Sequence, residues 1–261
     1  MKTFNYHSAK DGKEASKLAS SNSVFLAGGM TTIPSMKLGL ASYKDIINIK
    51  EIKKLSGIKV TGKKVIIGAT TTHAAVANSK DVKKTIPSLA ALAEGIGDPQ
   101  VRNRGTIGGS IANNDPAADY PSACLALNAI IHTSKRKIQA DKFFKGMFET
   151  DLKKGEIIET VEFEVPEKSG YAKFPNPASR YAIVGVYVAK FKTEIRVAVT
   201  GVASCVFRCK KLEDVLSSNF STSAIDSVNI SSKGFNADIH ASAEYRAHII
   251  KVMAKKAVSS C

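Results

Sequence analysis

Two kinds of hydrophobic pattern alternate along the first part of the chain. Apolar runs at residues 23–26, 45–49 and 64–69 predict strands. Residues 10–20 and 88–96 instead place their apolar side chains at helical spacing and predict helices. Strands that alternate with helices in this order indicate an α/β organisation.

A second α/β unit begins near residue 58. Residues 58–69 predict a hairpin, and residues 156–165 alternate apolar and polar side chains over one long predicted strand. We therefore divide this part of the chain into a first unit, residues 1–57, and a second unit, residues 58–170.

The pattern changes again at a proline-rich stretch, residues 166–177. We interpret this stretch as a domain boundary, so that residues 171–261 form a C-terminal domain. There, residues 181–189, 194–200 and 203–209 predict strands of an antiparallel meander with a single covered face. Helices are expected to close the chain over residues 211–216 and 244–258.

Charge restricts the class of protein. The 261 residues include 38 Lys and Arg against 23 Asp and Glu, which gives a net charge of +15. The basic residues are dispersed as doublets such as Lys53-Lys54 and Lys210-Lys211, which is typical of a solvated lysine-rich surface. No RNA-binding motif or zinc-finger spacing accompanies them. We therefore expect no nucleic-acid partner and favour a basic face toward an acidic partner subunit.

The sequence also predicts the compartment. It contains no run of about 18 apolar residues that would predict a transmembrane helix. The first residues lack the apolar core of a signal peptide, and the four cysteines are too scattered for a disulfide framework. We expect a reduced, cytoplasmic protein.

The chemistry of the chain is concentrated in residues 106–121. Two adjacent glycines, Gly108 and Gly109, suit positive φ and leave backbone N–H groups unshielded. Ser110 and Asn113 follow as side-chain donors, and Asp115 and Asp119 follow as acceptors of the kind that hold sugar hydroxyls. The order of these groups suits a ligand with a phosphate end and a ribose-like end.

A second glycine pair, Gly28-Gly29, follows the apolar run Phe25-Leu26-Ala27 and precedes Met30-Thr31-Thr32. After it, residues 34–37 are expected to form a short turn. Glycine pairs commonly mark plain turns, but two such turns can grip one pyrophosphate between their backbone donors. We interpret the two pairs as parts of one ligand site.

Other catalytic and nucleotide-binding patterns are absent. Residues 57–63 have P-loop spacing, but Lys64 stands where a magnesium-binding Ser or Thr belongs. The chain lacks the Gly-x-Gly-x-x-Gly fingerprint, a nucleophile elbow and paired metal ligands. His73 starts a predicted helix over residues 73–77, and we favour a histidine satisfied by backbone over an acid–base residue. Chemistry of this chain would therefore come from a bound cofactor.

Several sequence blocks resemble one known family, the FAD-binding medium subunits of molybdenum hydroxylases such as carbon monoxide and xanthine dehydrogenases. The blocks occur in the order typical of that family and span nearly the whole chain. They are Ala27-Gly28-Gly29-Met30-Thr31, Met36-Lys37-Leu38, Arg104 to Pro121, Pro177-Ala178-Ser179-Arg180-Tyr181 and Ala241-Ser242-Ala243-Glu244-Tyr245-Arg246.

The resemblance implies an α+β fold and a FAD site. Two N-terminal α/β subdomains of the PCMH-type FAD-binding fold, residues 1–57 and 58–170, would hold FAD between them. The C-terminal domain would contain a small antiparallel sheet and helices. The pyrophosphate would meet the backbone of residues 27–31 and 106–110, and Lys173 falls near a lysine that approaches the flavin in xanthine dehydrogenase-like members. The implied cofactor-binding residues are Ala27, Gly28, Gly29, Met30, Thr31, Thr32, Thr106, Gly108, Gly109, Ser110, Asn113, Asp115, Asp119, Ile158 and Lys173. Met30 departs from the polar residue often found after the first glycine pair.

The resemblance also implies partners. A large subunit would carry the molybdenum cofactor, and a small iron–sulfur subunit would carry two [2Fe-2S] clusters, in a heterotrimer that dimerises to a heterohexamer. Electrons would pass through FAD to NAD, a quinone or another acceptor. The iron–sulfur insert of the benzoyl-CoA reductase branch is absent. Two alternatives remain open, a free-standing flavin-dependent oxidoreductase of the same superfamily and a basic non-enzymatic binding module.

Overall fold

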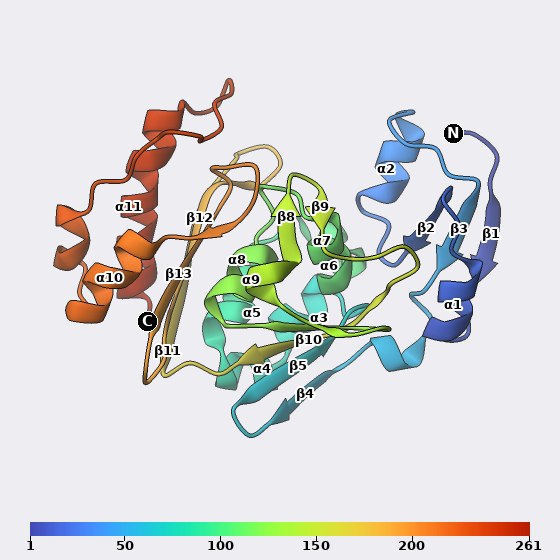
Figure 1. Ribbon diagram of the computed structural model, residues 1–261, viewed down its shortest axis with the longest axis horizontal. Helices are drawn as coiled ribbons and strands as arrows, with labels where there is room; N and C mark the ends of the chain where they lie inside the picture. The colour runs from blue at the N-terminus through green and yellow to red at the C-terminus, as the bar shows by residue number, and fades with distance from the viewer.

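The computed structural model describes residues 1–261 as three units arranged along the long axis of the molecule (Figure 1). The first unit contains a parallel sheet in the order β1-β3-β2. Buried Ala15 and Ile47 join α1 to this sheet in a small core. The elements of this unit are β1 (Asn5–Ser8), α1 (Gly12–Leu18), β2 (Ser23–Leu26), α2 (Thr32–Lys37), β3 (Asp45–Asn48) and a 3-10 turn, η1 (Lys53–Leu55).

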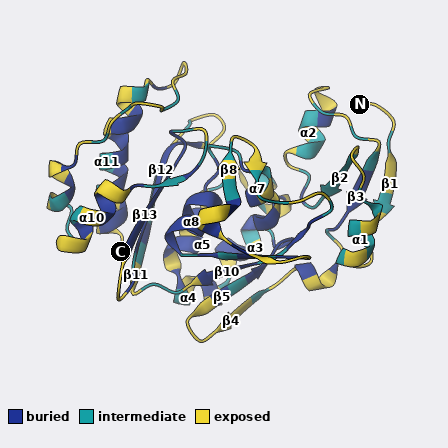
Figure 2. Cartoon of the chain, viewed as in Figure 1, coloured by how far each residue is buried: buried dark blue, intermediate teal, exposed yellow.

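The second unit is the centre of the molecule, where a five-stranded antiparallel sheet in the order β4-β5-β10-β6-β7 packs against helices. Its core includes Leu89, Ile107, Ile111 and Tyr120, all fully buried. Figure 2 shows the buried colour concentrated in this central unit. Its strands are β4 (Ile58–Thr61), β5 (Lys64–Gly68), β6 (Ile130–Thr133), β7 (Lys137–Gln139), β8 (Phe144–Gly146), β9 (Glu149–Thr150) and β10 (Ile158–Glu164). Its helices are α3 (His73–Asn78), α4 (Lys80–Thr85), α5 (Pro87–Glu94), α6 (Pro99–Arg104), α7 (Ile107–Asn113), α8 (Tyr120–Ala126) and α9 (Ala140–Phe143).

The third unit is a four-stranded antiparallel sheet in the order β11-β12-β13-β14, covered on its outer side by α10 and α11 (Figure 1). No helix of the structure has the length and apolar character needed to cross a membrane. The elements are β11 (Lys168–Pro175), β12 (Ala182–Lys190), β13 (Ile195–Thr200), β14 (Phe207–Arg208), α10 (Lys210–Ser218), a 3-10 turn η2 (Ser223–Ser227) and α11 (Ala243–Ser259).

The expected single covered face of the C-terminal sheet is wrong. Along β12, Val186 and Val188 pack into the core beneath α11, whereas Tyr187 and Ala189 pack into the core of the second unit. Both faces are therefore covered, and β12 is buried along nearly its whole length. The strand alternates between two apolar environments, so its sequence reads as one continuous hydrophobic run.

Two local expectations also need correction. Residues 34–37 belong to helix α2 rather than to a turn, and only residues 207 and 208 of the third expected C-terminal strand pair with β13. The stretch interpreted as a domain boundary, residues 166–177, contains β11, which pairs with β12 along its length. The domain limits stay predictions, but the pairing of β11 favours a boundary before Lys168 rather than after residue 170.

The α+β fold class is confirmed, with mixed helix and strand, two N-terminal units and a C-terminal antiparallel sheet with helices.

Candidate cofactor site

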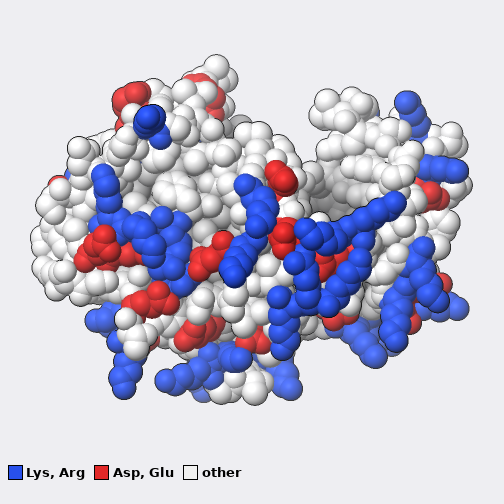
Figure 3. Space-filling view, in the orientation of Figure 1, with Lys and Arg blue, Asp and Glu red and all other residues white.

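The main cavity of the molecule lies where the three units meet and has a volume of about 590 Å³. The space-filling view shows the molecule hollowed between the central body and the first unit (Figure 3). The first unit contributes residues between Val24 and Ile49, the second contributes α7 together with residues before and after it, and the third contributes residues 179–181. A ligand in this cavity would contact all three.

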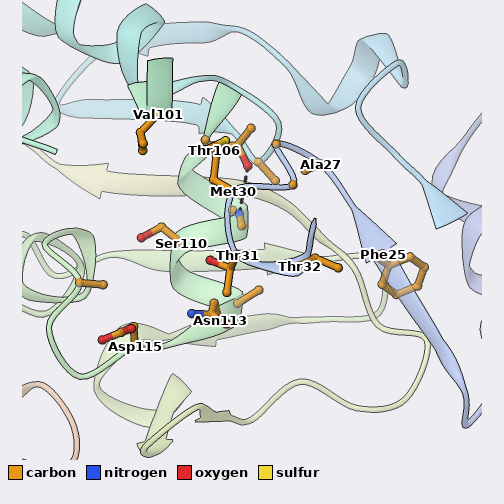
Figure 4. Close-up of a pocket in the computed structure, with 18 of the residues that line it drawn as sticks. Phe25, Ala27, Met30, Thr31, Thr32, Val101, Thr106, Ser110, Asn113 and Asp115 are labelled. Carbon is orange, nitrogen blue, oxygen red and sulfur yellow. Dashed lines mark hydrogen bonds between the residues drawn. The ribbon is translucent and has the colours of Figure 1, made fainter. Parts of the chain in front are cut away.

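The first glycine loop, residues 27–32, connects β2 to α2 along one wall (Figure 4). Gly29 has a φ of +74°, which favours glycine. None of the backbone N–H groups of residues 28–32 donates a hydrogen bond to another part of the chain. Consecutive free N–H groups around a residue of positive φ form an anion-binding concavity. This loop therefore has the backbone donors that the sequence predicted.

Gly28 brings this loop directly against the second motif. A Cβ atom at residue 28 would lie 2.1 Å from the carbonyl oxygen of Arg104 and 2.8 Å from the Cα of Gly105. Real Cβ atoms do not approach backbone so closely, so only glycine permits this contact. The first and second units therefore meet backbone to backbone at the floor of the cavity.

The second glycine pair lies within helix α7, not in a turn. Neither Gly108 nor Gly109 has positive φ, so that expectation is wrong. Their N–H groups are also engaged within the chain, because Gly108 donates to the Ala69 carbonyl at 2.8 Å and Gly109 donates to Thr106 Oγ1 at 3.1 Å. Thr106 is the N-cap of the helix, a role that its hydroxyl suits. The backbone of this motif thus offers a ligand fewer free donors than predicted.

The two glycines of α7 allow close approach on opposite sides of the helix. A Cβ at Gly108 would lie 2.5 Å from the Cβ of Ala69, so this residue packs against the end of β5. Gly109 is exposed and lines the cavity with Ala112 and Asn113, which follow it at helical spacing. Figure 4 shows Ser110 and Asn113 on α7, with Thr31 and Thr32 on the facing loop.

Carboxylates lie beyond the C-terminal end of α7. Asp115 lines the cavity, and burial raises its pKa above the usual value. Asp119 also lines the cavity with only 4% exposure. It accepts hydrogen bonds from the Tyr171 hydroxyl and from Lys173 Nζ, which lies 3.0 Å away. Burial raises the pKa of Asp119, and the charge of Lys173 opposes that rise.

Lys173 itself does not line the cavity. Its ammonium group donates to the carbonyls of Gly95 at 2.8 Å and Arg180 at 2.9 Å, besides its pairing with Asp119. Since these acceptors hold the group in place, Lys173 stands behind the wall formed by Asp119 and Arg180. A direct contact with a cofactor stays a prediction. Every other residue predicted for the site lines the cavity.

Several lining residues were not predicted. Phe25, Tyr43 and Ile157 supply apolar wall, which no local motif distinguishes from core. Arg180 and Tyr181 come from the third unit, and Arg180 has a φ of +61° and donates to the Gly97 carbonyl at 3.2 Å. Both residues belong to the Pro177–Tyr181 block, which resembles the family in sequence but was not predicted to line the site.

His73 also lines the cavity and is only 5% exposed. Its backbone N–H donates to the Gly105 carbonyl at 3.0 Å, whereas ring atom Nδ1 is buried without a partner. Burial, with a smaller effect of the Arg102 charge, lowers the pKa of His73 to about 4. The ring is therefore neutral at physiological pH. The prediction that backbone groups satisfy this histidine holds for its main-chain N–H but not for ring atom Nδ1.

Residues 2–167 match the family described as the FAD binding domain in molybdopterin dehydrogenase. The chain belongs to this family. It is therefore a FAD-binding oxidoreductase subunit, as the sequence resemblance implied. The match covers the first two units and ends just before β11. All lining residues of the cavity except residues 179–181 lie within the matched range.

Relatives extend the similarity over nearly the full chain. The glyceraldehyde dehydrogenase medium chain of Sulfolobus acidocaldarius is 36% identical over 276 residues, covering 97% of this chain and 96% of the relative. The carbon monoxide dehydrogenase medium chain of Hydrogenophaga pseudoflava is 36% identical over 222 residues, covering 78% and 77%. A solved structure, reconstituted CO dehydrogenase from Oligotropha carboxidovorans, matches with a TM-score of 0.90 and 27% identity, covering 99% of this chain and 97% of that one.

Proposed function

We propose that this chain is the electron-transfer subunit of a molybdenum hydroxylase, passing electrons from a [2Fe-2S] cluster of a partner subunit through FAD to an external acceptor. The observation that carries the proposal is the cavity, in which free N–H groups of residues 28–32 stand opposite the polar side chains of α7. The acceptor would be NAD, a quinone or another oxidant.

The groups that line the cavity fit FAD. Residues 28–32 can donate to a pyrophosphate, and Asp115 can accept from sugar hydroxyls or ring N–H groups. The apolar side chains of Phe25 and Ile157 give flat rings a dry wall. Gly109 leaves room for a ligand to approach the backbone of α7. We therefore assign all the predicted lining residues to the FAD site.

The protein contributes binding and orientation. A bound flavin accepts and releases electrons by its own chemistry. His73 is neutral and buried, and Asp119 is engaged by Tyr171 and Lys173, so neither is a free acid or base. The residues that line the cavity would hold the cofactor and exclude water from it.

The proposed partners are those that the sequence resemblance implies. We propose a small subunit with two [2Fe-2S] clusters and a large subunit with the molybdenum cofactor, in a heterotrimer that dimerises to a heterohexamer in the cytoplasm. The names of the relatives support this, since several are medium chains or subunits of named dehydrogenase complexes.

Co-expression with candidate partners tests the proposal. The purified chain should be yellow, release FAD rather than FMN on denaturation, and co-purify with both partners. Substrate added without oxygen should reduce first the clusters and then the flavin, which absorbance changes resolve. A folded chain without flavin would support the binding-module alternative, and substrate turnover by the chain alone would support the free-standing enzyme.

A further inference from the structure

A short hairpin projects from the second unit beside the cofactor cavity, where β8 and β9 stand on the upper side of the central unit in Figure 1. Gly146 pairs with Glu149, so Met147 and Phe148 form its tip. Met147 is 52% exposed and Phe148 is 58% exposed. The tip therefore presents two adjacent large apolar side chains to solvent.

The conformation of the tip is unfavourable for its sequence. Phe148 has a φ of +56°, in the left-handed region where turns ordinarily use glycine or asparagine. A bulky aromatic residue there is a true outlier, and such outliers persist where the surrounding structure imposes them and often mark functional positions. More than half of the Phe148 side chain stays exposed in this strained conformation.

The tip is braced against the cofactor helix. Asn114, the left-handed C-cap of α7, donates from Nδ2 to the carbonyls of Gly146 and Glu149, each at 2.8 Å. In return, the N–H of Phe148 donates to the Asn114 carbonyl at 3.1 Å. Asn113 and Asp115, on either side of Asn114, line the cavity. The hairpin is therefore attached rigidly to the wall of the FAD site.

The charge around the tip restricts what can bind there. Exposed Lys142, Lys145 and Lys154 flank the hairpin in sequence without an ion-pair partner. The acidic neighbours Asp141 and Asp151 are paired with Arg196 and Arg136, which leaves Glu149 as the unpaired carboxylate of the hairpin. A rigid aromatic anchor within a basic rim complements an apolar pocket with an acidic rim. Since the hairpin is joined to the wall of the cavity, a protein seated on it would stand next to the cofactor, where an electron donor must come.

We propose that Met147 and Phe148 anchor the iron–sulfur subunit by inserting into an apolar pocket with an acidic rim on its surface. This inference rests on the proposed function, because it requires that such a partner delivers electrons to this chain. The tip supplies the centre of a larger interface, and the lysines speed association through charge attraction.

The test compares binding of the purified iron–sulfur subunit to the full-length FAD-loaded chain and to M147S/F148N. Asparagine tolerates the left-handed conformation, so the variant should keep its thermal midpoint and its FAD content. Its Kd should rise at least about 30-fold, the usual effect of losing a hot-spot side chain. The control is Ile239→Asn, which polarises an apolar residue that is 95% exposed on the loop before α11 and should leave the Kd unchanged.

The possible results distinguish failure of the proposed function from failure of the hairpin inference. If the unmodified chain does not bind the iron–sulfur subunit, the proposed function fails. If it binds and M147S/F148N binds equally well, the hairpin inference alone is overturned. Loss of binding to the large subunit only, or an equal loss in Ile239→Asn, also overturns it. As a second measurement, Lys142→Glu combined with Lys145→Glu should slow association and weaken its dependence on salt, and an unchanged rate would contradict the basic rim.

Discussion

The two glycines of α7 allow a sharp test of which side of that helix meets FAD. Alanine at Gly109 adds a methyl group on the exposed, cavity-lining side, where the only neighbouring atom is Thr106 Oγ1 at 3.0 Å. Alanine favours a helix over glycine by about 1 kcal/mol, and disturbing the Thr106 cap costs about 1 kcal/mol. The two effects offset, so Gly109→Ala should fold with nearly unchanged stability.

The methyl group should act on cofactor affinity instead. If it displaces FAD enough to lose one charge-assisted hydrogen bond, the loss is about 1.5–3 kcal/mol, or a roughly ten-fold to hundred-fold rise in Kd. Fluorescence titration of the apoprotein with FAD measures this rise, and urea unfolding followed by circular dichroism measures stability.

Gly108→Ala is the matched control. Its methyl group would lie 2.5 Å from the Cβ and 2.7 Å from the carbonyl oxygen of Ala69, so overpacking should destabilise the fold by about 1–3 kcal/mol. The fraction that folds should lose less FAD affinity than Gly109→Ala does, because the added methyl group faces Ala69 rather than the cavity. A Gly109→Ala protein that folds and binds FAD with wild-type affinity would refute the placement of the cofactor against this side of α7.

Three further predictions test other contacts of the site. Gly28→Ala places a Cβ 2.1 Å from the Arg104 carbonyl oxygen, so it should separate the first glycine loop from the backbone of residues 104–105. Stability should fall by about 1–3 kcal/mol, and the variant should not retain FAD on gel filtration. A yellow, stable variant would contradict the contact. The unfolded chain protonates His73 near pH 6.5, but the folded chain protonates it only near pH 4. The free energy of unfolding should therefore fall as the pH drops through this window, by about 1.4 kcal/mol per pH unit and about 3 kcal/mol in all. Urea unfolding of His73→Phe should show a correspondingly weaker pH dependence. Lys173→Met should destabilise the protein by about 3–5 kcal/mol because it leaves the buried Asp119 carboxylate unpaired, and adding Asp119→Asn should restore part of that loss if the pair is ionic in the folded chain.

The sequence predicted the groups of the site better than their conformations. Motif composition identified both glycine pairs, and all residues assigned to the cavity except Lys173 line it. The Gly-Gly pattern did not reveal that Gly108 and Gly109 are helical, because a glycine can serve either of two purposes. It can adopt positive φ, or it can allow close packing, as at Gly108 against Ala69. The local sequence is the same in either case.

Tertiary contacts explain what could not be predicted. The apolar side chains of Phe25 and Ile157 read as core residues, and only the meeting of the units turns them into cavity wall. Proline at positions 166, 175 and 177 suggested a domain boundary, yet Lys168–Pro175 form a strand that pairs with β12. Helices α4 and α6 are too short to show a clear helical period.

The burial of β12 between two cores has a consequence for how such chains can be divided or recombined. The family match ends at residue 167, yet the hydroxyl of Tyr187 meets Ser88 Oγ at 2.6 Å, deep inside the matched part. A fragment cut at that limit would expose the apolar surface that Tyr187 and Ala198 cover. The segment that the family match covers is therefore smaller than the unit that folds. If C-terminal domains are exchanged between relatives, the face of the new sheet that packs against the second unit must match the core of that unit.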